Sequence, residues 1–263
     1  MIFEQLFEPI RSNNLVVRLA ESEAEVEAAQ RLRYQIFCEE MGGKGNPEVQ
    51  RQKRDFDKYD DVCHHVLVMD TSRPAEHGVI GTYRLLTREN MEKVGSFYTE
   101  TEYDVSKIKA NGGRLLELGR SCVEQQYRTR PVIQMLWQGI GAYIQAQNIE
   151  LMFGCASFHN TNVNEHKHAL SYLYHYHLAP EHIRPRTLPD LYVNMNLMPK
   201  EEVVPRAAIN ALPTLIKGYL RLNGFVGDGA FLDYAYNTCD VSIVVQTQNV
   251  QQKYADRYIP DAQ

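Results

Sequence analysis

The chain has 263 residues, of which 44% are hydrophobic and 23% are charged, so its composition is that of an ordinary folded protein. Its formal net charge of −5 offers no basic field for a nucleic acid. No stretch reaches the roughly 18 apolar residues that a membrane-spanning helix needs. The five cysteines include no C-x-x-C pair, so we expect reduced thiols and a cytoplasmic protein.

Hydrophobic patterning predicts alternating strands and helices up to about residue 165. The N-terminal arm (1–14) has no Arg-rich start, so it is not typical of a secretory signal. Met91 and Phe97 are expected to anchor a mixed segment before the central strand. This order indicates an α/β fold with a mixed central sheet flanked by helices. The predicted elements are strand Leu15–Leu19, a helix from Ser22 to Phe37, strands His65–Met69, Val79–Leu86 and Arg114–Val123, helix Pro131–Gln147, strand Leu151–Phe158 and a helix capped within Asn160–Asn164.

The C-terminal third is predicted to elaborate this fold rather than to form a second domain. No Ser- or Gly-rich linker separates the two parts, so we expect a single domain over residues 15–250, preceded by the arm and followed by a polar tail (251–263). The elements expected here are a loop over Pro180–Pro189, a strand at Tyr192–Asn196, a helix at Leu212–Leu222, a Gly-rich turn at Phe225–Phe231 and a strand at Val241–Val245.

The chain is organised around the central strand Arg114–Val123, the polar elbow that follows it (124–130), and the helix that Pro131 opens. Proline suits a first helical turn because its missing N–H would be unpaired there. Free backbone N–H groups and the positive end of the helix dipole meet at such an elbow. The arrangement therefore favours an anionic or thioester-bearing ligand.

The strand–elbow–helix unit resembles the GNAT acyltransferase fold. In that fold the elbow normally carries a Gly-rich R-x-x-G-x-G/A turn around the coenzyme A pyrophosphate. Here Arg128 matches the basic residue, but Arg130-Pro131 occupies the first Gly position, and Gly139 and Gly141 lie inside the helix. The resemblance therefore implies a donor without the adenosine diphosphate end, such as acyl carrier protein with its phosphopantetheine arm, and no tightly bound cofactor.

A second set of residues resembles the signature of acyl-homoserine-lactone synthases, which use acyl carrier protein donors. The Trp of that signature is absent, because the only Trp of this chain is Trp137. An acyl-homoserine-lactone synthase is therefore kept as the alternative enzyme. The matching positions are Arg33, Phe37, Asp57 to Asp60, Gly81 to Arg84, Phe97 and Glu117 to Arg120.

A third set resembles the bacterial ornithine N-acyltransferases, some of which carry the label hemolysin. This resemblance implies transfer of a 3-hydroxyacyl chain from acyl carrier protein to the α-amine of ornithine, giving lyso-ornithine lipid; glutamine, glycine or lysine stay open as acceptors. A non-catalytic membrane-active protein is the alternative of another class, but the chain has no lytic cationic segment. The matching segments are Phe153–Phe158, Leu212–Leu222, Gly227–Ala230 and Asn237–Val241, with Asn223 in place of the usual Gly.

Three groups of site residues follow from the chemistry and these resemblances. The catalytic candidates are Glu117, as the base for the amine, and Arg120. Arginines suit the carboxylate of an amino acid, and aspartates suit its side-chain ammonium. The substrate-binding candidates are Arg33, Phe37, Asp57, Asp60, Arg84 and Ser157, with Asp61 as a further carboxylate. The donor-binding candidates are Cys122 and Val123, whose N–H groups would meet the oxyanion, and Arg128, Thr129 and Arg130, which suit a phosphate.

Each group also has a simpler structural interpretation. The arginines, aspartates and Glu117 could pair as an interior ion network, and the elbow cations could be a solvated turn. Lys107, Lys109 and Arg114 could extend the elbow cations into a patch for the acidic carrier protein. Lys217 and Arg221 suit either an anionic lipid surface or a packed helix. The His-rich segment His159–His182 lacks zinc-ligand spacing, and Cys122 or Cys155 would need His64 or His65 nearby to act as a nucleophile, so metal and covalent catalysis are both disfavoured.

Overall fold

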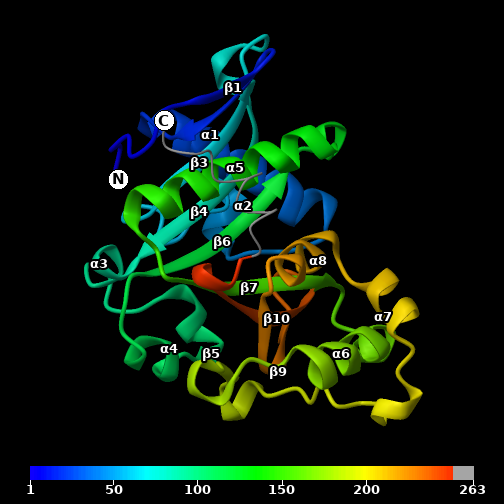
Figure 1. The fold of residues 1–263 in the computed structure, drawn as a ribbon. Helices are drawn as coiled ribbons and strands as arrows, with labels where there is room; N and C mark the ends of the chain where they lie inside the picture. The colour runs from blue at the N-terminus through cyan, green and yellow to red at the C-terminus, as the bar shows by residue number, and fades with distance from the viewer. Residues whose placement is uncertain (251–263) are drawn as a thin grey trace. The chain divides into compact units, whose positions relative to one another are not determined.

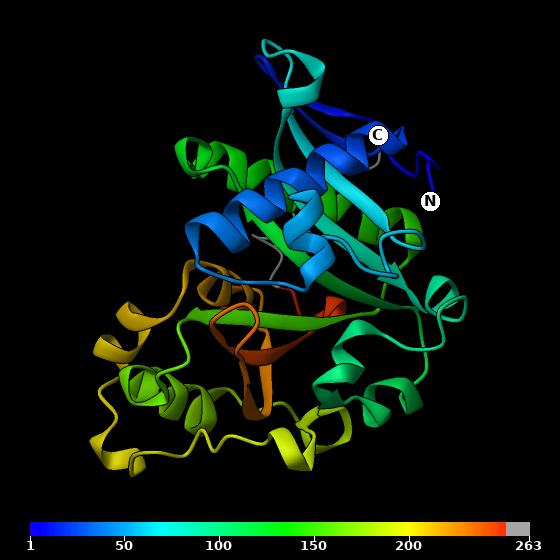
Figure 2. The ribbon, with the colours of Figure 1, turned by 180° about the vertical axis from the view of Figure 1, so that it is seen from behind.

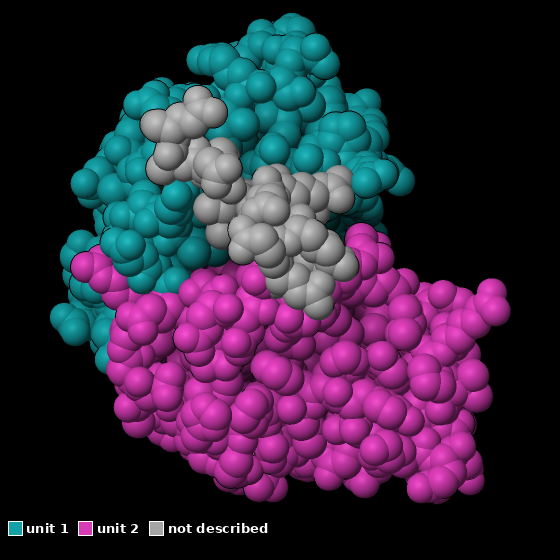
Figure 3. Space-filling view, in the orientation of Figure 1, with its two compact units in different colours: residues 1–96, 118–149, 252–263 teal, residues 97–117, 150–251 magenta. Residues whose placement is uncertain are grey.

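The computed structural model describes residues 1–250, so the predicted polar tail (251–263) lies outside the described residues. The chain forms two compact units (Figure 3). Among the described residues, unit 1 contains Met1–Ser96 and Leu118–Ile149, and unit 2 contains Phe97–Glu117 and residues 150–250. The central strand β6, Leu115–Val123, therefore contributes its first residues to unit 2 and its last residues to unit 1.

Unit 1 is built on a sheet whose strands follow the order β1-β2-β3-β4-β6 (Figure 1). Neighbouring strands from β1 to β4 are antiparallel. In the register Val17 of β2 lies opposite Val68 of β3, and Val68 lies opposite Gly81 of β4. The bounds are β1 Ile10–Ser12, β2 Leu15–Leu19, β3 His64–Asp70 and β4 Val79–Thr87.

Helices cover both faces of this sheet, as Figures 1 and 2 show from opposite sides. Helix α1, Glu23–Tyr34, begins at Ser22, whose side chain accepts the Glu25 N–H as predicted. It continues as a wider π-helical turn, Gln35–Glu40, and short helices α2 (Pro47–Gln52) and α3 (Arg88–Met91) follow. Helix α5, Arg130–Gln147, covers the other face.

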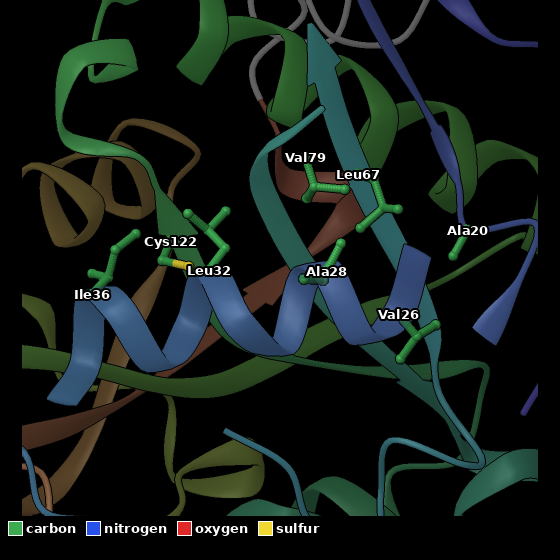
Figure 4. Close-up of a cluster of buried hydrophobic side chains, with 9 residues drawn as sticks. Ala20, Val26, Ala28, Leu32, Ile36, Leu67, Val79 and Cys122 are labelled. Atoms are coloured by element: carbon green, nitrogen blue, oxygen red, sulfur yellow. The ribbon is translucent and has the colours of Figure 1, made fainter. Parts of the chain in front are cut away.

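The core between α1 and the sheet explains why this sequence folds here. Apolar side chains of α1 pack on Leu67 of β3, Val79 of β4 and Cys122 of β6 (Figure 4). On the opposite face, Gly139 lets α5 approach the sheet closely. A Cβ atom there would lie 2.7 Å from Val17 Cγ2 and 3.1 Å from Val66 Cγ1. Gly139 is therefore a packing residue within the helix.

Unit 2 has a mixed sheet in the order β6-β7-β10-β9-β8-β5. Strand β7 runs parallel to β6, with Glu117 opposite Phe153. Strand β10 lies antiparallel to both β7 and β9. The strands are β5 Tyr103–Asp104, β7 Leu151–His159, β8 Arg186–Thr187, β9 Phe225–Asp233 and β10 Thr238–Gln246; the helices are α4 Ser106–Ala110, α6 Val163–His177, α7 Pro205–Ala211 and α8 Thr214–Arg221.

The predicted α/β order with a mixed sheet flanked by helices is confirmed, whereas two C-terminal predictions were wrong. Phe225–Phe231 is not a turn but lies in β9. Its glycines permit close packing, because a Cβ on Gly227 would lie 2.9 Å from the Pro185 carbonyl oxygen. The expected strand at Tyr192–Asn196 is reduced to an isolated bridge between Val193 and Ala230. No helix within residues 1–250 is long and apolar enough to cross a membrane.

Candidate active site

Arg33 lies at the centre of an ion network in the interior of unit 1. Its side chain is 0% exposed. Nε donates to Asp55 at 2.8 Å, Nη1 and Nη2 donate to the two Asp60 oxygens at 2.9 and 3.1 Å, and Nη2 also donates to the Asp55 carbonyl. A guanidinium that is engaged on every nitrogen and shielded from water favours a structural role for Arg33.

The electrostatics of this network keep both signs charged. Burial alone would raise the pKa of Asp60, but the guanidinium groups of Arg33 and Arg84 outweigh it and hold that pKa well below its usual range. Burial would likewise lower the pKa of Arg33, and the carboxylates of Asp60 and Asp55 reverse this effect. The network therefore fixes α1 and the loop after α2 onto the sheet at neutral pH.

The accessible edge of the network consists of Asp57 and Arg120. Their side chains are 24% and 15% exposed, whereas Arg84 is only 4% exposed. Arg84 Nη1 donates to Asp57 at 2.6 Å, and Arg120 Nη2 lies 3.5 Å from the other Asp57 oxygen. Arg120 Nε lies 3.2 Å from Asp55. Of Arg33, Arg84 and Arg120, Arg120 is the one that a substrate in solvent can reach most readily.

Arg120 also interrupts the regular geometry of β6. Its φ of +52° is left-handed, a conformation that costs a non-glycine residue roughly 1–2 kcal/mol. Such strain persists only where the surroundings impose it, and it concentrates at functional sites. The irregularity precedes Cys122 and Val123, whose N–H groups were predicted to meet the oxyanion.

Glu117 is held by backbone groups within unit 2. Its carboxylate oxygens accept the N–H groups of Tyr98 at 2.9 Å and Thr99 at 2.6 Å. These N–H groups belong to the first turn of the 3₁₀-helix Tyr98–Thr101. Glu117 is 5% exposed. The geometry thus gives Glu117 a fixed orientation and a capping role that the sequence did not indicate.

The elbow presents exposed polar groups at the start of α5. Arg128, Thr129 and Arg130 are all exposed. Arg128 donates to the Val123 carbonyl at 3.0 Å and pairs with Glu40 at 2.7 Å. Thr129 occupies the N-cap position, but its side chain makes no capping bond. The first N–H groups of this long helix are therefore not capped by the residue that usually does so.

The buried thiols and histidines are poor candidates for covalent catalysis. Burial raises the pKa of Cys122 to about 12 and that of Cys155 well above its usual value, so both stay protonated at neutral pH. Burial lowers the pKa of His64 and of His65 to about 4. The histidines of α6 instead bind loops, as where His175 contacts the Met198 carbonyl and His168 accepts the Val204 N–H.

The remaining predicted residues are distributed over both units. Phe37 packs beside the α1 core, and Ser157 is exposed on β7 opposite Asp240. Lys107 pairs with Glu181, and Lys109 with Glu100 at 2.9 Å, so each already has an acidic partner. The sequence analysis missed Asp55. The sequence signal that could have identified Asp55 is its position two residues before Asp57 in a charged loop.

Comparison with known proteins first identifies the fold family of this chain. Residues 32–138 match the acetyltransferase (GNAT) domain family. The fold is also similar to FeeM, an N-acyl amino acid synthase from uncultured soil microbes (TM-score 0.51, 9% identity, 92% of this chain and 93% of that chain), and to the acyl-homoserine-lactone synthase LasI (TM-score 0.51, 11% identity, 95% and 98%). These matches show that the chain has the GNAT fold.

Relatives with higher sequence identity identify the enzyme family. The L-ornithine N(alpha)-acyltransferase of Rhizobium meliloti (strain 1021) is 44% identical over 96% of this chain and 86% of its own length. That of Brucella abortus (strain 2308) is 43% identical over 96% and 91%. This chain belongs to the L-ornithine N(alpha)-acyltransferase family, and it is an amino acid N-acyltransferase.

Proposed function

We propose that this protein transfers a 3-hydroxyacyl chain from acyl carrier protein to the α-amine of ornithine, forming lyso-ornithine lipid. The full-length similarity to L-ornithine N(alpha)-acyltransferases carries the proposal. The elbow supports the choice of donor, because it lacks the glycines that a coenzyme A pyrophosphate needs and keeps Arg128 and Arg130 exposed.

The reaction is the aminolysis of a thioester. The neutral amine bonds to the thioester carbonyl carbon, the C–S bond breaks, and the departing thiolate gains the proton that the amine loses. A free α-amine has a pKa of about 7.7–8.0, so a modest base is sufficient. We assign this role to Glu117, acting directly or through water. Its two backbone bonds orient the carboxylate.

The acceptor carboxylate is assigned to Arg120. Its side chain keeps 15% exposure and faces Asp57, whose charge holds the guanidinium in place. Arg33 and Arg84 support this edge through Asp60 rather than by touching the substrate. Phe37 and Ser157 stay as predicted contacts for the acceptor.

The phosphate of the phosphopantetheine arm is assigned to the start of α5. The first N–H groups of α5, which the Thr129 side chain does not cap, favour a phosphate there, as do the positive helix end and the side chains of Thr129 and Arg130. The N–H groups of Cys122 and Val123 are assigned to the oxyanion. The protein would act in the cytoplasm, with its amphiphilic product drawing it to the inner membrane surface.

Acyl transfer by the purified protein tests this proposal. 3-Hydroxyacyl carrier protein and the matching 3-hydroxyacyl coenzyme A are each offered with ornithine, lysine, glutamine or glycine, and products are identified by mass spectrometry. We expect N-acyl ornithine from the carrier-protein donor at least ~10-fold faster than from coenzyme A, since one charge-assisted contact between the acidic carrier protein and a basic side chain of the enzyme is worth about a factor of ten. Acylhomoserine lactone formed from S-adenosylmethionine would instead support the alternative enzyme.

A further inference from the structure

The first half of the elbow is bound to the hairpin that joins β3 to β4, through contacts that all lie within unit 1. The Tyr127 hydroxyl donates to Asp70 Oδ2 at 2.6 Å. Arg73 Nη1 and Nη2 donate to the Glu124 carboxylate at 2.6 and 3.2 Å. The Arg73 guanidinium also lies over the Tyr127 ring, 5.3 Å from its centroid. Two hairpin residues, Asp70 and Arg73, therefore hold two elbow residues, Tyr127 and Glu124.

Asp70 is a fixed and charged acceptor for the Tyr127 hydroxyl. It ends β3 and is 4% exposed. Its Oδ1 accepts the Asn14 side chain at 2.6 Å, and the Ser72 N–H and hydroxyl at 2.9 and 2.6 Å. The hydroxyls of Ser72 and Tyr127 hold the pKa of Asp70 well below its usual range, so the carboxylate is charged at neutral pH. A hydrogen bond from a hydroxyl to a charged carboxylate is stronger than one between neutral groups.

The backbone of Tyr127 connects this anchored half to the start of α5. Its N–H donates to the Glu124 carbonyl at 2.8 Å, and its carbonyl accepts the Thr129 N–H at 2.6 Å. Thr129 is the N-cap residue of α5, and its carbonyl accepts the Ile133 N–H at 3.2 Å. The elbow (124–130) contains no glycine, so none of its residues is specialised for an unusual backbone conformation. The placement of Thr129 therefore depends on the contacts of the residues that precede it.

Exposure separates the anchoring residues of the elbow from those that a ligand can reach. Tyr127 is half-buried and the Glu124 side chain is 15% exposed. Arg128, Thr129 and Arg130 are all exposed. Ordering a mobile segment costs free energy on binding, so a backbone that is already fixed strengthens the contact with a ligand. The anchored half of the elbow thus supports its accessible half.

We infer that Tyr127 and Asp70, supported by Arg73 and Glu124, are positioning residues for the acyl donor. They do not touch the donor. They fix the elbow so that its accessible half and the first N–H groups of α5 face the donor phosphate in one arrangement. The inference rests on the proposed function and deepens it, because it names the residues that set the affinity of the elbow for the phosphate.

Two donors that differ only in the phosphate test this role. The 3-hydroxyacyl thioesters of 4′-phosphopantetheine and of pantetheine are each offered with ornithine, and kcat and KM are measured with the full chain. We expect the unaltered protein to prefer the phosphorylated donor at least ~10-fold in kcat/KM, since a charge-assisted contact is worth about that factor. Tyr127→Phe removes only the hydroxyl. It should reduce this preference about 3- to 10-fold by raising the KM for the phosphorylated donor, with the KM for ornithine unchanged.

Tyr192→Phe is the matched control. Tyr192 also donates its hydroxyl to an aspartate, Asp228, at 2.9 Å, but the pair lies in unit 2. This variant should leave the donor preference unchanged. Arg73→Met is a second, independent variant, because it keeps a long side chain while removing both the Glu124 pair and the cation over the Tyr127 ring. It should reduce the donor preference about 2- to 5-fold.

The ratio between the two donors separates positioning from general support of the fold. If Tyr127→Phe and Arg73→Met lower kcat/KM for both donors by the same factor, or change the ratio no more than Tyr192→Phe does, these contacts only support the fold and the inference is overturned. If the unaltered protein shows no preference between the two donors, the assignment of the phosphate to the elbow fails, and this inference fails with it. If the protein acylates ornithine from no donor, acyl carrier protein included, the proposed function itself fails.

Discussion

Replacing Glu117 with Gln separates its two roles, because the carboxylate both caps a turn and is proposed to take the proton. Glu117 accepts the Tyr98 N–H at 2.9 Å and the Thr99 N–H at 2.6 Å. An amide offers one acceptor oxygen, so one of these N–H groups would face an NH₂. That loss should lower the free energy of unfolding by about 1–3 kcal/mol. Removing a general base typically costs 10²–10⁴ in rate, so we expect turnover to fall at least ~10-fold.

A matched variant in the same turn isolates the chemical effect. Glu100 caps the turn as well, since its side chain accepts the Phe97 N–H at 2.9 Å, but it does not lie on β6. Glu100→Gln should lower stability without the loss of turnover. The assays are kcat at saturating donor, urea unfolding, and carrier-protein binding, which neither variant should change. If Glu117→Gln loses stability but keeps full turnover, or if both variants lose turnover equally, Glu117 is a structural residue and the assignment of the base is refuted.

Three further perturbations test other parts of the reasoning. Arg130→Ala should raise the apparent KM for acyl carrier protein about 10-fold and leave the KM for the amino acid unchanged. If the KM for acyl carrier protein does not change, the assignment of the phosphate to the elbow is wrong. Asp60→Asn should destabilise the fold by about 3–5 kcal/mol, because it leaves Arg33 buried beside an uncharged partner, and urea unfolding measures this loss. Because the pKa of Asp60 is depressed in the folded state, its contribution is present above the unfolded pKa of about 3.9 and is lost as pH falls below it; a stability that is flat down to pH 2 would contradict the network. Burial raises the pKa of Cys122 to about 12, so Cys122 should resist alkylation by iodoacetamide at pH 8 in the folded protein. The variant Cys122→Ala should stay active. If enzyme activity is lost in step with labelling of Cys122, a covalent mechanism would be supported instead.

The parts of the fold that the sequence predicted best are those governed by local rules. The capping side chain of Ser22 and the apolar period of α1 are encoded within one or two turns. A turn was predicted in place of strand β9, because glycine normally indicates a turn. Here the small size of glycine instead allows close packing within a strand. Gly229 has a φ of +89°, and a Cβ on it would lie 2.5 Å from the Tyr192 ring. That contact depends on a segment distant in sequence, so no local pattern reveals it.

The candidate site likewise combines features that the local sequence predicts with features that only tertiary contacts create. Arg120 and Glu117 were found because they lie three residues apart in a recognisable motif, but the left-handed backbone of Arg120 and the capping of Tyr98 and Thr99 by Glu117 arise from tertiary contacts. The approach of the Glu102 and Asp240 side chains, whose carboxylate oxygens lie within 4.8 Å of each other, is likewise not evident from the sequence. It depends on how the turn before β5 is placed over the face of β7 and β10.

The two sets of clustered carboxylates in this protein differ in composition, although each contains three aspartates or glutamates. In unit 1 the carboxylates are interleaved with Arg33, Arg84 and Arg120 at 2.6–3.5 Å, so the charges neutralise one another and rigidify the site. In unit 2 the carboxylates of Glu102, Asp233 and Asp240 lie within 4.8 Å of one another and come from three separate segments of the chain. Tertiary packing, and not local sequence, therefore brings the second set together.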